Sequence, residues 1–166
     1  ARFGADTSVA IIWVGLTVVE VIRYKKIDTV ELSNNIKELI AKHGIHPSQV
    51  ITDSDGLGAG VVDNIRCTPF VNNSSPLHKQ NFSNLKSQSY VKLSDLVTSL
   101  VEELTQELLT VKLKDVDKDN KIQVISKDEQ KKILGKSPDL SDALMMRMYY
   151  EIKNMKTTAK YSIQYI

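Results

Sequence analysis

An α/β domain with a mixed sheet is the fold that this sequence of 166 residues predicts. Two strand-like runs separated by a short turn open the chain, and such a pair favours an antiparallel hairpin. Strand-like and helix-like runs then alternate, which is typical of parallel pairing in an α/β domain. Apolar residues make up 42% of the chain and charged residues 25%, as in ordinary globular domains. The expected architecture is an antiparallel hairpin plus parallel strands, flanked by helices.

The predicted hairpin occupies the first part of the chain. Residues 8–14 (SVAIIWV) are dense in β-branched and aromatic side chains and predict a buried strand. Residues 15–17 turn the chain, and the second half of residues 18–27 (VVEVIRYKKI) alternates apolar and charged side chains. That alternation is typical of a strand with one buried face, so the two runs are expected to pair.

The first predicted helix covers about residues 30–43, where apolar side chains recur at helical spacing. Asp28 or Thr29 can cap its start, and Gly44 is expected to end it. A strand, a helix and a second strand are predicted next, over residues 49–52, 60–66 and 68–71. This order indicates a parallel section of the sheet.

The second half of the chain is expected to be mainly helical. Its predicted elements are a helical region over about 82–109 interrupted near 92–98, a hairpin of 111–116 and 122–125, and helices over 127–134 and about 137–155. No linker or internal repeat divides the chain. We therefore expect one domain over residues 1–155, followed by a polar tail over 156–166.

Composition excludes several classes of protein. Cys67 is the only cysteine, so an internal disulfide and a cysteine-based zinc site are both excluded, and a reducing cytosolic setting fits best. The longest apolar run, residues 9–14, is far too short to cross a bilayer, so no membrane partner is expected. The net charge of +2 permits a polyanionic partner without requiring one.

Residues 51–60 (ITDSDGLGAG) offer a choice between a nucleotide loop and a carboxylate site. The glycine spacing is G-x-G-x-G, whereas a dinucleotide fingerprint requires G-x-G-x-x-G after the first strand. Asp53 and Asp55 precede the glycines and would repel a phosphate that no cation accompanies. A P-loop sequence is absent from the whole chain, so we expect no bound ATP.

A carboxylate site is the better interpretation of this stretch. Asp53 directly follows an apolar strand, at the end where open α/β sheets place their ligands, and the glycines allow a turn that side chains would obstruct. A second acidic cluster, SPDLSDAL, places Asp139 and Asp142 one helical turn apart. Asp6, beside the first strand, is a third candidate. The alternative is that these aspartates merely cap helices or interact with helix dipoles.

Several carboxylates that converge could hold a pair of Mg²⁺ or Mn²⁺ ions, since hard cations prefer oxygen ligands. Such a two-metal site hydrolyses phosphodiesters. Four lysines near the second acidic cluster would ordinarily form a solvated surface, but beside a metal site they would suit a DNA backbone. These candidates for DNA contact are Lys127, Lys131, Lys132 and Lys136.

Four sequence blocks together resemble the C-terminal nuclease domain of the phage terminase large subunit. They are ARFGADTSV, VITDSDGLGAGVVDNI, NFSNLKSQSYVKL and ISKDEQKKILGKSPDLSDAL, in the order that the family has them, and they span about residues 1–150. The last block is the most specific. The family pattern there is S-K-D, a basic helix, and then G-[RK]-S-P-D-L-[AS]-D-A-L.

The resemblance implies a ribonuclease-H-like fold and a metal-dependent endonuclease that cuts concatemeric viral double-stranded DNA. Asp53 matches the family's second acidic ligand, Asp139 or Asp142 the third, and Asp6 an auxiliary position. The family's first ligand would lie two residues before Ala1, so cleavage by this stretch alone is expected to be impaired. The resemblance also implies the terminase small subunit and the portal protein as partners, in the cytoplasm of the bacterial host.

Two alternatives stay open at this stage. The domain could be a non-catalytic module of the same fold that docks DNA or the portal. It could also be another ribonuclease-H-like nuclease, such as a junction resolvase.

Overall fold

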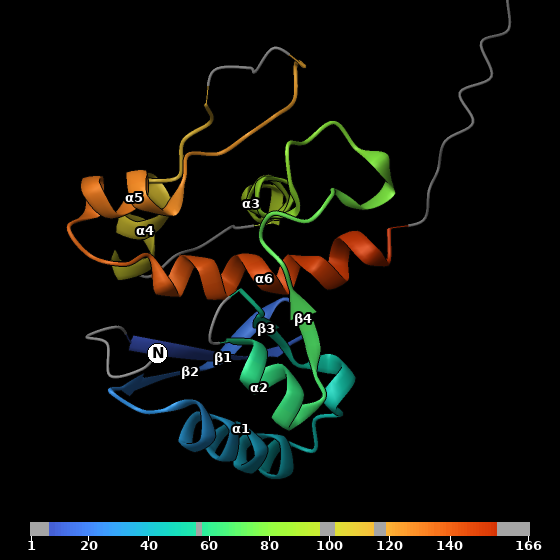
Figure 1. Cartoon of the computed structure of the whole chain (residues 1–166), viewed down its shortest axis with the longest axis vertical. Helices are drawn as coiled ribbons and strands as arrows, with labels where there is room; N and C mark the ends of the chain where they lie inside the picture. The colour runs from blue at the N-terminus through green and yellow to red at the C-terminus, as the bar shows by residue number, and fades with distance from the viewer. Residues whose placement is uncertain (1–6, 56–57, 97–101, 115–118, 156–166) are drawn as a thin grey trace, which may run out of the picture.

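The chain forms a layered α/β structure in a computed structural model that describes residues 7–55, 58–96, 102–114 and 119–155 (Figure 1). Its strands are β1 (Thr7–Val14), β2 (Thr17–Lys25), β3 (Ile51–Asp53) and β4 (Thr68–Phe70). Its α-helices are α1 (Thr29–His43), α2 (Gly58–Ile65), α3 (Leu85–Leu96), α4 (Glu102–Leu109), α5 (Lys127–Leu134) and α6 (Asp139–Lys153). Helices α1 and α2 cover one side of the strands, α6 crosses the other side, and α3, α4 and α5 lie beyond α6.

The predicted combination of antiparallel and parallel strands is confirmed. Strands β1 and β2 pair antiparallel, with Ile11 opposite Val21, and β3 and β4 pair parallel, with Asp53 opposite Phe70. Each pair has its own ladder of hydrogen bonds among the described residues. Both β1 and β3 pack against α6, so this helix spans the two pairs.

Helix α1 begins and ends at the residues that its sequence predicts. Asp28 is the N-cap, because its Oδ1 accepts a hydrogen bond of 2.8 Å from the backbone N–H of Glu31. Gly44 ends the helix in a left-handed conformation with φ of 62°, which glycine adopts without a steric cost.

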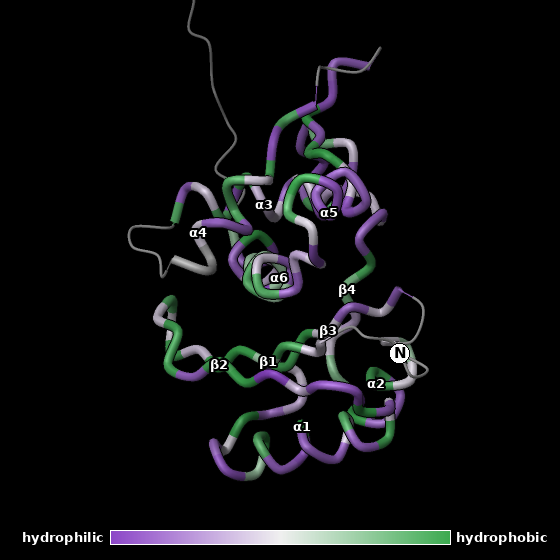
Figure 2. The backbone as a smooth tube through the Cα atoms, turned by 90° about the vertical axis from the view of Figure 1, so that its left-hand side faces the viewer, coloured by the Kyte–Doolittle hydropathy of each residue, from purple (hydrophilic) through white to green (hydrophobic). Residues whose placement is uncertain are grey.

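The main hydrophobic core lies where α6 meets α3 and the strands. Its buried side chains are Phe70, Leu85, Tyr90, Leu93, Val124, Leu140, Leu144, Met145, Met148 and Ile152. A smaller cluster of Val61, Ile65 and Cys67 joins α2 to the apolar face of α1. Figure 2 shows the apolar β1 strand between these two layers. The start of α6 is thereby fixed against the end of β3.

Several predicted boundaries were wrong by a few residues, each for a local reason. The strand predicted over 49–52 begins at Ile51, because Pro47–Gln49 forms a 3₁₀ turn capped by the His46 side chain. The helix predicted from residue 60 begins at Gly58.

The second predicted hairpin is a single antiparallel bridge between Leu113 and Val124 rather than a pair of strands. Residues 115–118 of that prediction lie outside the described part. None of the described helices combines the length and apolar character needed to cross a bilayer.

Candidate active site

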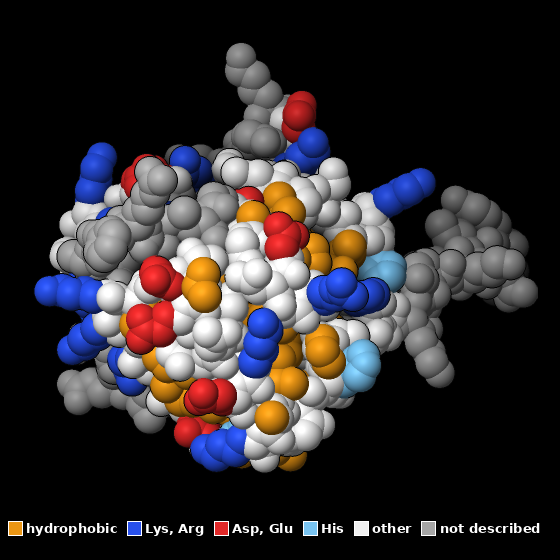
Figure 3. Space-filling view, turned by 60° about the horizontal axis from the view of Figure 1, so that its bottom comes forward, with side chains coloured by type: hydrophobic (Ala, Val, Ile, Leu, Met, Phe, Trp, Pro, Cys, Tyr) orange, Lys and Arg blue, Asp and Glu red, His pale blue; other side chains and the backbone are white. Residues whose placement is uncertain are grey.

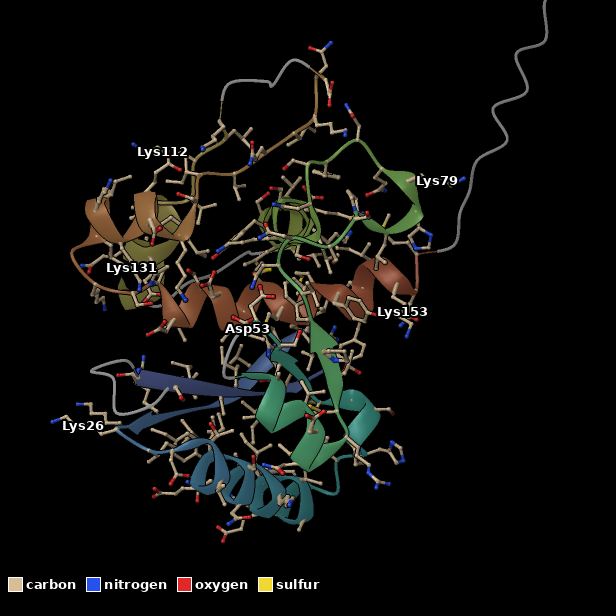
Figure 4. The ribbon with its side chains drawn as sticks, viewed as in Figure 1. Lys26, Asp53, Lys79, Lys112, Lys131 and Lys153 are labelled. Carbon is tan, nitrogen blue, oxygen red and sulfur yellow. The ribbon has the colours of Figure 1, made fainter. Side chains whose placement is uncertain are left out.

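The end of β3 carries the first acidic group. Asp53 is the last residue of the strand, and Figure 4 shows it where β3 reaches α6. Its Oδ1 accepts hydrogen bonds from the backbone N–H of Asp55 at 2.9 Å and from the Asn72 side-chain amide at 3.2 Å. The same amide donates to Asp55 Oδ2 at 2.8 Å, so Asn72 links the two carboxylates.

The space around residue 58 explains why a glycine is needed shortly after Asp53. A β-carbon at Gly58 would lie 1.7 Å from the backbone oxygen of Asp53, which no real structure allows. Helix α2 can therefore start this close to β3 because residue 58 has no side chain. The prediction that the glycines permit a tight passage from strand to helix is confirmed at this position.

The pKa of Asp53 is raised above its ordinary value. Partial burial is the largest cause, and the neighbouring carboxylates of Asp55 and Asp142 raise the pKa further. The hydrogen bond from the Asp55 backbone and the charge of Lys127 act in the opposite direction without overcoming these effects. This end of the site is therefore short of positive charge.

The first turn of α6 carries the second acidic group, and cations surround it. Asp142 Oδ1 lies 3.0 Å from the Lys86 ammonium and accepts a hydrogen bond of 2.7 Å from the Tyr90 hydroxyl. Asp142 Oδ2 lies 3.0 Å from the Lys127 ammonium, which is also 3.5 Å from Asp139 Oδ1. Asp139 Oδ1 additionally accepts a hydrogen bond from Ser137.

These contacts reverse the effect of burial on Asp142. Burial by itself would raise the pKa of this carboxyl, but the charges of Lys86 and Lys127 and the hydrogen bond from Tyr90 lower it overall. Burial would depress the pKa of Lys127, yet Asp142, Asp139 and Asp53 raise it. Burial and the neighbouring Asp142 hold the pKa of Tyr90 well above 10.0, so its hydroxyl keeps its proton and acts as a donor.

The start of α6 is held by a residue from another helix. The N-cap position of this helix is Pro138, which has no capping side chain. Glu107 of α4 instead accepts a hydrogen bond of 2.8 Å from the backbone N–H of Ser141. Because Glu107 is only 2% exposed, this distant carboxylate serves as a buried cap for the helix.

Both acidic groups line a cleft of about 860 Å³ whose walls include residues of β1, α1, β3 and α6. Asp53, Asp139, Asp142 and Lys127 all line it, although they come from three different elements. Within the described residues, no three acidic, histidine or cysteine side chains converge closely enough to hold an ion. In this arrangement the Lys127 ammonium is paired with both Asp139 and Asp142.

The other predicted site residues have different locations. Asp6 lies outside the described residues. Lys131 and Lys132 belong to the last turn of α5, and Lys136 follows in the loop that leads to α6, 3.8 Å from Glu107.

Sequence reasoning missed several residues that shape the site: Asn72, Lys86, Tyr90 and Glu107. One signal was available for two of them, because Lys86 and Tyr90 are spaced four apart and so share a face of the predicted helix. Asn72 and Glu107 have no comparable spacing to the residues that they contact.

The donor chemistry of the site fits a divalent metal ion. All the acidic groups offer hard oxygen ligands, which Mg²⁺ and Mn²⁺ prefer. The raised pKa of Asp53 shows a carboxylate that an added cation would stabilise.

The strands and the flanking helices give this chain a fold similar to that of a viral terminase nuclease domain. One similar solved structure is of the nuclease domain of the large terminase subunit gp2 of bacterial virus Sf6. That domain has a TM-score of 0.73 and 22% identity over 89% of this chain and 84% of its own length.

Two further structures are of a lysine-to-alanine mutant of the same viral domain. The mutant with manganese and β-thujaplicinol has a TM-score of 0.73 and 21% identity, and the mutant with calcium has 0.71 and 22%. Each matches 89% of this chain and 84% of the other. No protein-family model and no curated protein sequence matches the chain. The predicted fold is confirmed by this likeness.

Proposed function

We propose that this chain is the metal-dependent endonuclease domain of a viral DNA-packaging terminase and cuts double-stranded DNA. The observation that carries the proposal is that Asp53 and the Asp139–Asp142 pair, far apart in the sequence, line one cleft. The fold supports the proposal, since it is shared with a viral terminase nuclease domain whose structures include manganese or calcium.

Asp53, Asp139 and Asp142 would hold the Mg²⁺ or Mn²⁺ ions, with Asp6 in support. When bound, a pair of such ions lowers the pKa of an attacking water and stabilises the leaving oxygen of a phosphodiester. Lys127, which lies against Asp139 and Asp142, would meet a DNA phosphate that enters the cleft. The buried donors around Asp142 keep that carboxylate ionised at neutral pH.

Lys131, Lys132 and Lys136 would contact the DNA backbone beside the cleft. Figure 4 shows Lys131 on α5 and Lys112 on the segment beyond it, on the same side of the molecule. The face formed around α1 is different, because acidic, basic and apolar side chains are interspersed there (Figure 3). A mixed surface provides no uniform attraction for a phosphate backbone, whereas grouped lysines do.

In this role the domain would act in the cytoplasm of the bacterial host. The terminase small subunit and the portal protein would be its partners. The domain itself would bind no ATP, because the chain contains no P-loop.

Nicking of supercoiled plasmid in Mn²⁺ tests the proposal. The assay uses the chain as given and a form extended upstream by its native residues, because the resemblance places a further ligand before Ala1. We expect the extended form to nick DNA, and Asp53→Asn to lower its rate by roughly 100-fold or more, since a metal ligand is lost. Asp63→Asn, an exposed aspartate on α2, is the matched control and should nick normally.

The rival functions predict other results. Failure of both forms to nick any DNA, together with retained DNA binding, would support a docking module. A strong preference for branched over linear DNA would support a resolvase.

DNA binding is tested separately by salt titration. Replacing both Lys131 and Lys132 with alanine should lower the affinity and reduce the slope of log K against log salt by roughly 2, about 0.9 for each lost phosphate contact. Replacing Lys37 and Lys42, two exposed lysines of α1 on the other side of the strands, should leave the slope unchanged.

A further inference from the structure

The two oxygens of Asp142 have different surroundings. Oδ1 is held by the Lys86 ammonium at 3.0 Å and by the Tyr90 hydroxyl at 2.7 Å. Oδ2 is paired with the Lys127 ammonium at 3.0 Å. The carboxylate therefore has one oxygen bound by α3 and one bound by α5.

Lys86 and Tyr90 act together because they lie one turn apart on α3, on the same face of the helix. The Lys86 ammonium lies 5.6 Å from the centre of the Tyr90 ring, a distance that allows a cation–π contact. Tyr90 is 3% exposed, and its hydroxyl also lies 3.2 Å from Ser141 Oγ. The packing around this tyrosine leaves its hydroxyl little freedom to move.

The cleft distinguishes the two oxygens. Lys127 and Asp142 line it, whereas Lys86 and Tyr90 are not among the residues that line it. Oδ1 is consequently directed into the protein, toward donors that the cleft does not reach. Oδ2 is the oxygen on the cleft side.

The first turn of α3 also contacts the other acidic group. The backbone N–H of Lys86 donates to the backbone oxygen of Asn72 at 3.1 Å, and the Asn72 side chain donates to both Asp53 and Asp55. A continuous series of contacts thus runs from Asp53 through Asn72 and Lys86 to Asp142. Helix α3 therefore links the two acidic groups, in addition to the direct packing of α6 against β3.

We propose that Lys86 and Tyr90 are positioning residues for Asp142: they hold Oδ1, so that Oδ2, which is now paired with Lys127, would be the oxygen that meets a divalent metal ion. The proposal rests on the nuclease function proposed above. Partners that orient a metal-ligating carboxylate typically change metal affinity or activity by about 10–100-fold when they are removed.

The first test needs no metal ion and asks whether the contact is formed. A double-mutant cycle compares Tyr90→Phe in the native chain and in Asp142→Ala by denaturant unfolding in EDTA. We expect Tyr90→Phe to change the unfolding equilibrium constant roughly tenfold more in the native chain, because a hydrogen bond to a charged group is lost only there. Equal effects in both backgrounds would overturn the proposal.

The second test measures the dissociation constant for Mn²⁺ by calorimetry and the nicking kinetics of the upstream-extended form. Tyr90→Phe and Lys86→Met should each weaken Mn²⁺ binding by roughly tenfold and lower kcat without raising KM for DNA. Lys86→Arg, which keeps the charge, should recover most of the loss. Tyr149→Phe is the matched control, because no contact with Asp142 is formed by that hydroxyl.

The outcomes separate the two proposals. If Tyr90→Phe and Lys86→Met bind Mn²⁺ as the unmodified protein does, the positioning role is overturned while the nuclease proposal stands. If the unmodified, extended protein neither binds Mn²⁺ nor nicks DNA, the nuclease proposal fails. In that case, any coupling between Tyr90 and Asp142 in the EDTA experiment would reflect a contact that serves stability alone. The positioning role would then be overturned as well.

Discussion

The two acidic groups of the cleft differ in how their negative charge is balanced. Neutral donors hold Asp53 and Asp55, namely a backbone N–H and the Asn72 amide. Two ammonium groups and a phenol hold Asp142. The pKa of Asp53 is accordingly raised, with burial as the largest cause, whereas cations outweigh burial and lower the pKa of Asp142.

This comparison shows that proximity in one cleft does not give carboxylates equivalent roles. Asp142 is stabilised by the protein itself, so removing it leaves the Lys86 ammonium without its ion pair. Asp53 is not stabilised to the same extent, so its ionised form is kept at a cost to stability that a bound cation would offset. Four measurements test this contrast and the elements that carry the two groups, in order of decreasing expected effect.

Asp142→Ala should lower the free energy of unfolding by about 3 kcal/mol or more, because it leaves Lys86 as a largely buried, unpaired charge. The side chains of Lys86 and Asp142 are 12% and 16% exposed. Asp53→Ala should cost less than about 1 kcal/mol, or stabilise the metal-free protein, because it removes a poorly compensated charge. Urea unfolding in EDTA measures both changes, and equal losses would contradict the comparison.

Gly58→Ala should lower the free energy of unfolding by about 2–3 kcal/mol, since the new β-carbon would collide with the backbone of Asp53. Gly60→Ala is the matched control in the same helix. Its β-carbon would meet only the Thr29 methyl, at 3.0 Å, and a change within about 1 kcal/mol is expected. Thermal unfolding of both variants measures the difference, and equal stability would show that α2 shifts without cost.

Glu107→Ala should lower the free energy of unfolding by about 2 kcal/mol, because the Ser141 N–H at the start of α6 loses its acceptor. Glu107→Gln retains an acceptor oxygen and should cost clearly less. Chemical denaturation of the two variants tests this. An equal cost would mean that the charge of Glu107, rather than its hydrogen bond, holds the helix.

The pH dependence of stability should differ in sign between the two groups, and this is the smallest effect. Asp142 has a lowered pKa, so its stabilisation is complete above the ordinary value of 3.8 and is lost as pH falls through its folded value. Asp53 has a raised pKa in the folded protein, so its ionised carboxylate lowers stability. This cost is absent below pH 3.8 and develops as the pH rises through the pKa of the folded state.

Unfolding of the metal-free protein and of Asp53→Asn between pH 3 and pH 7 measures this effect. The variant should gain stability relative to the unmodified protein as the pH rises above 3.8. A constant difference across that range would show that Asp53 has an ordinary pKa.

Local features of the sequence were sufficient to predict much of the fold. Helix α5 covers residues 127–134, as predicted, because Ser126 and Glu129 form a capping box at its start and Gly135 ends it. Asp53 ends a strand, and Asp139 and Asp142 lie in one helical turn, as their spacing indicates. Each of these features depends on residues within a few positions of one another, so a single sequence contains the information.

Tertiary structure alone decided how the carboxylates are held. Lys86 and Tyr90 reach Asp142 because α3 packs against α6, and Glu107 reaches Ser141 because α4 packs beside the same helix. Asn72 contacts Asp53 because β3 and β4 are neighbouring parallel strands. Contacts between residues so far apart in sequence leave no periodic pattern. The sequence by itself determined which acidic side chains the chain has and which local elements carry them, but only packing between distant elements decided which of them is balanced by positive charge.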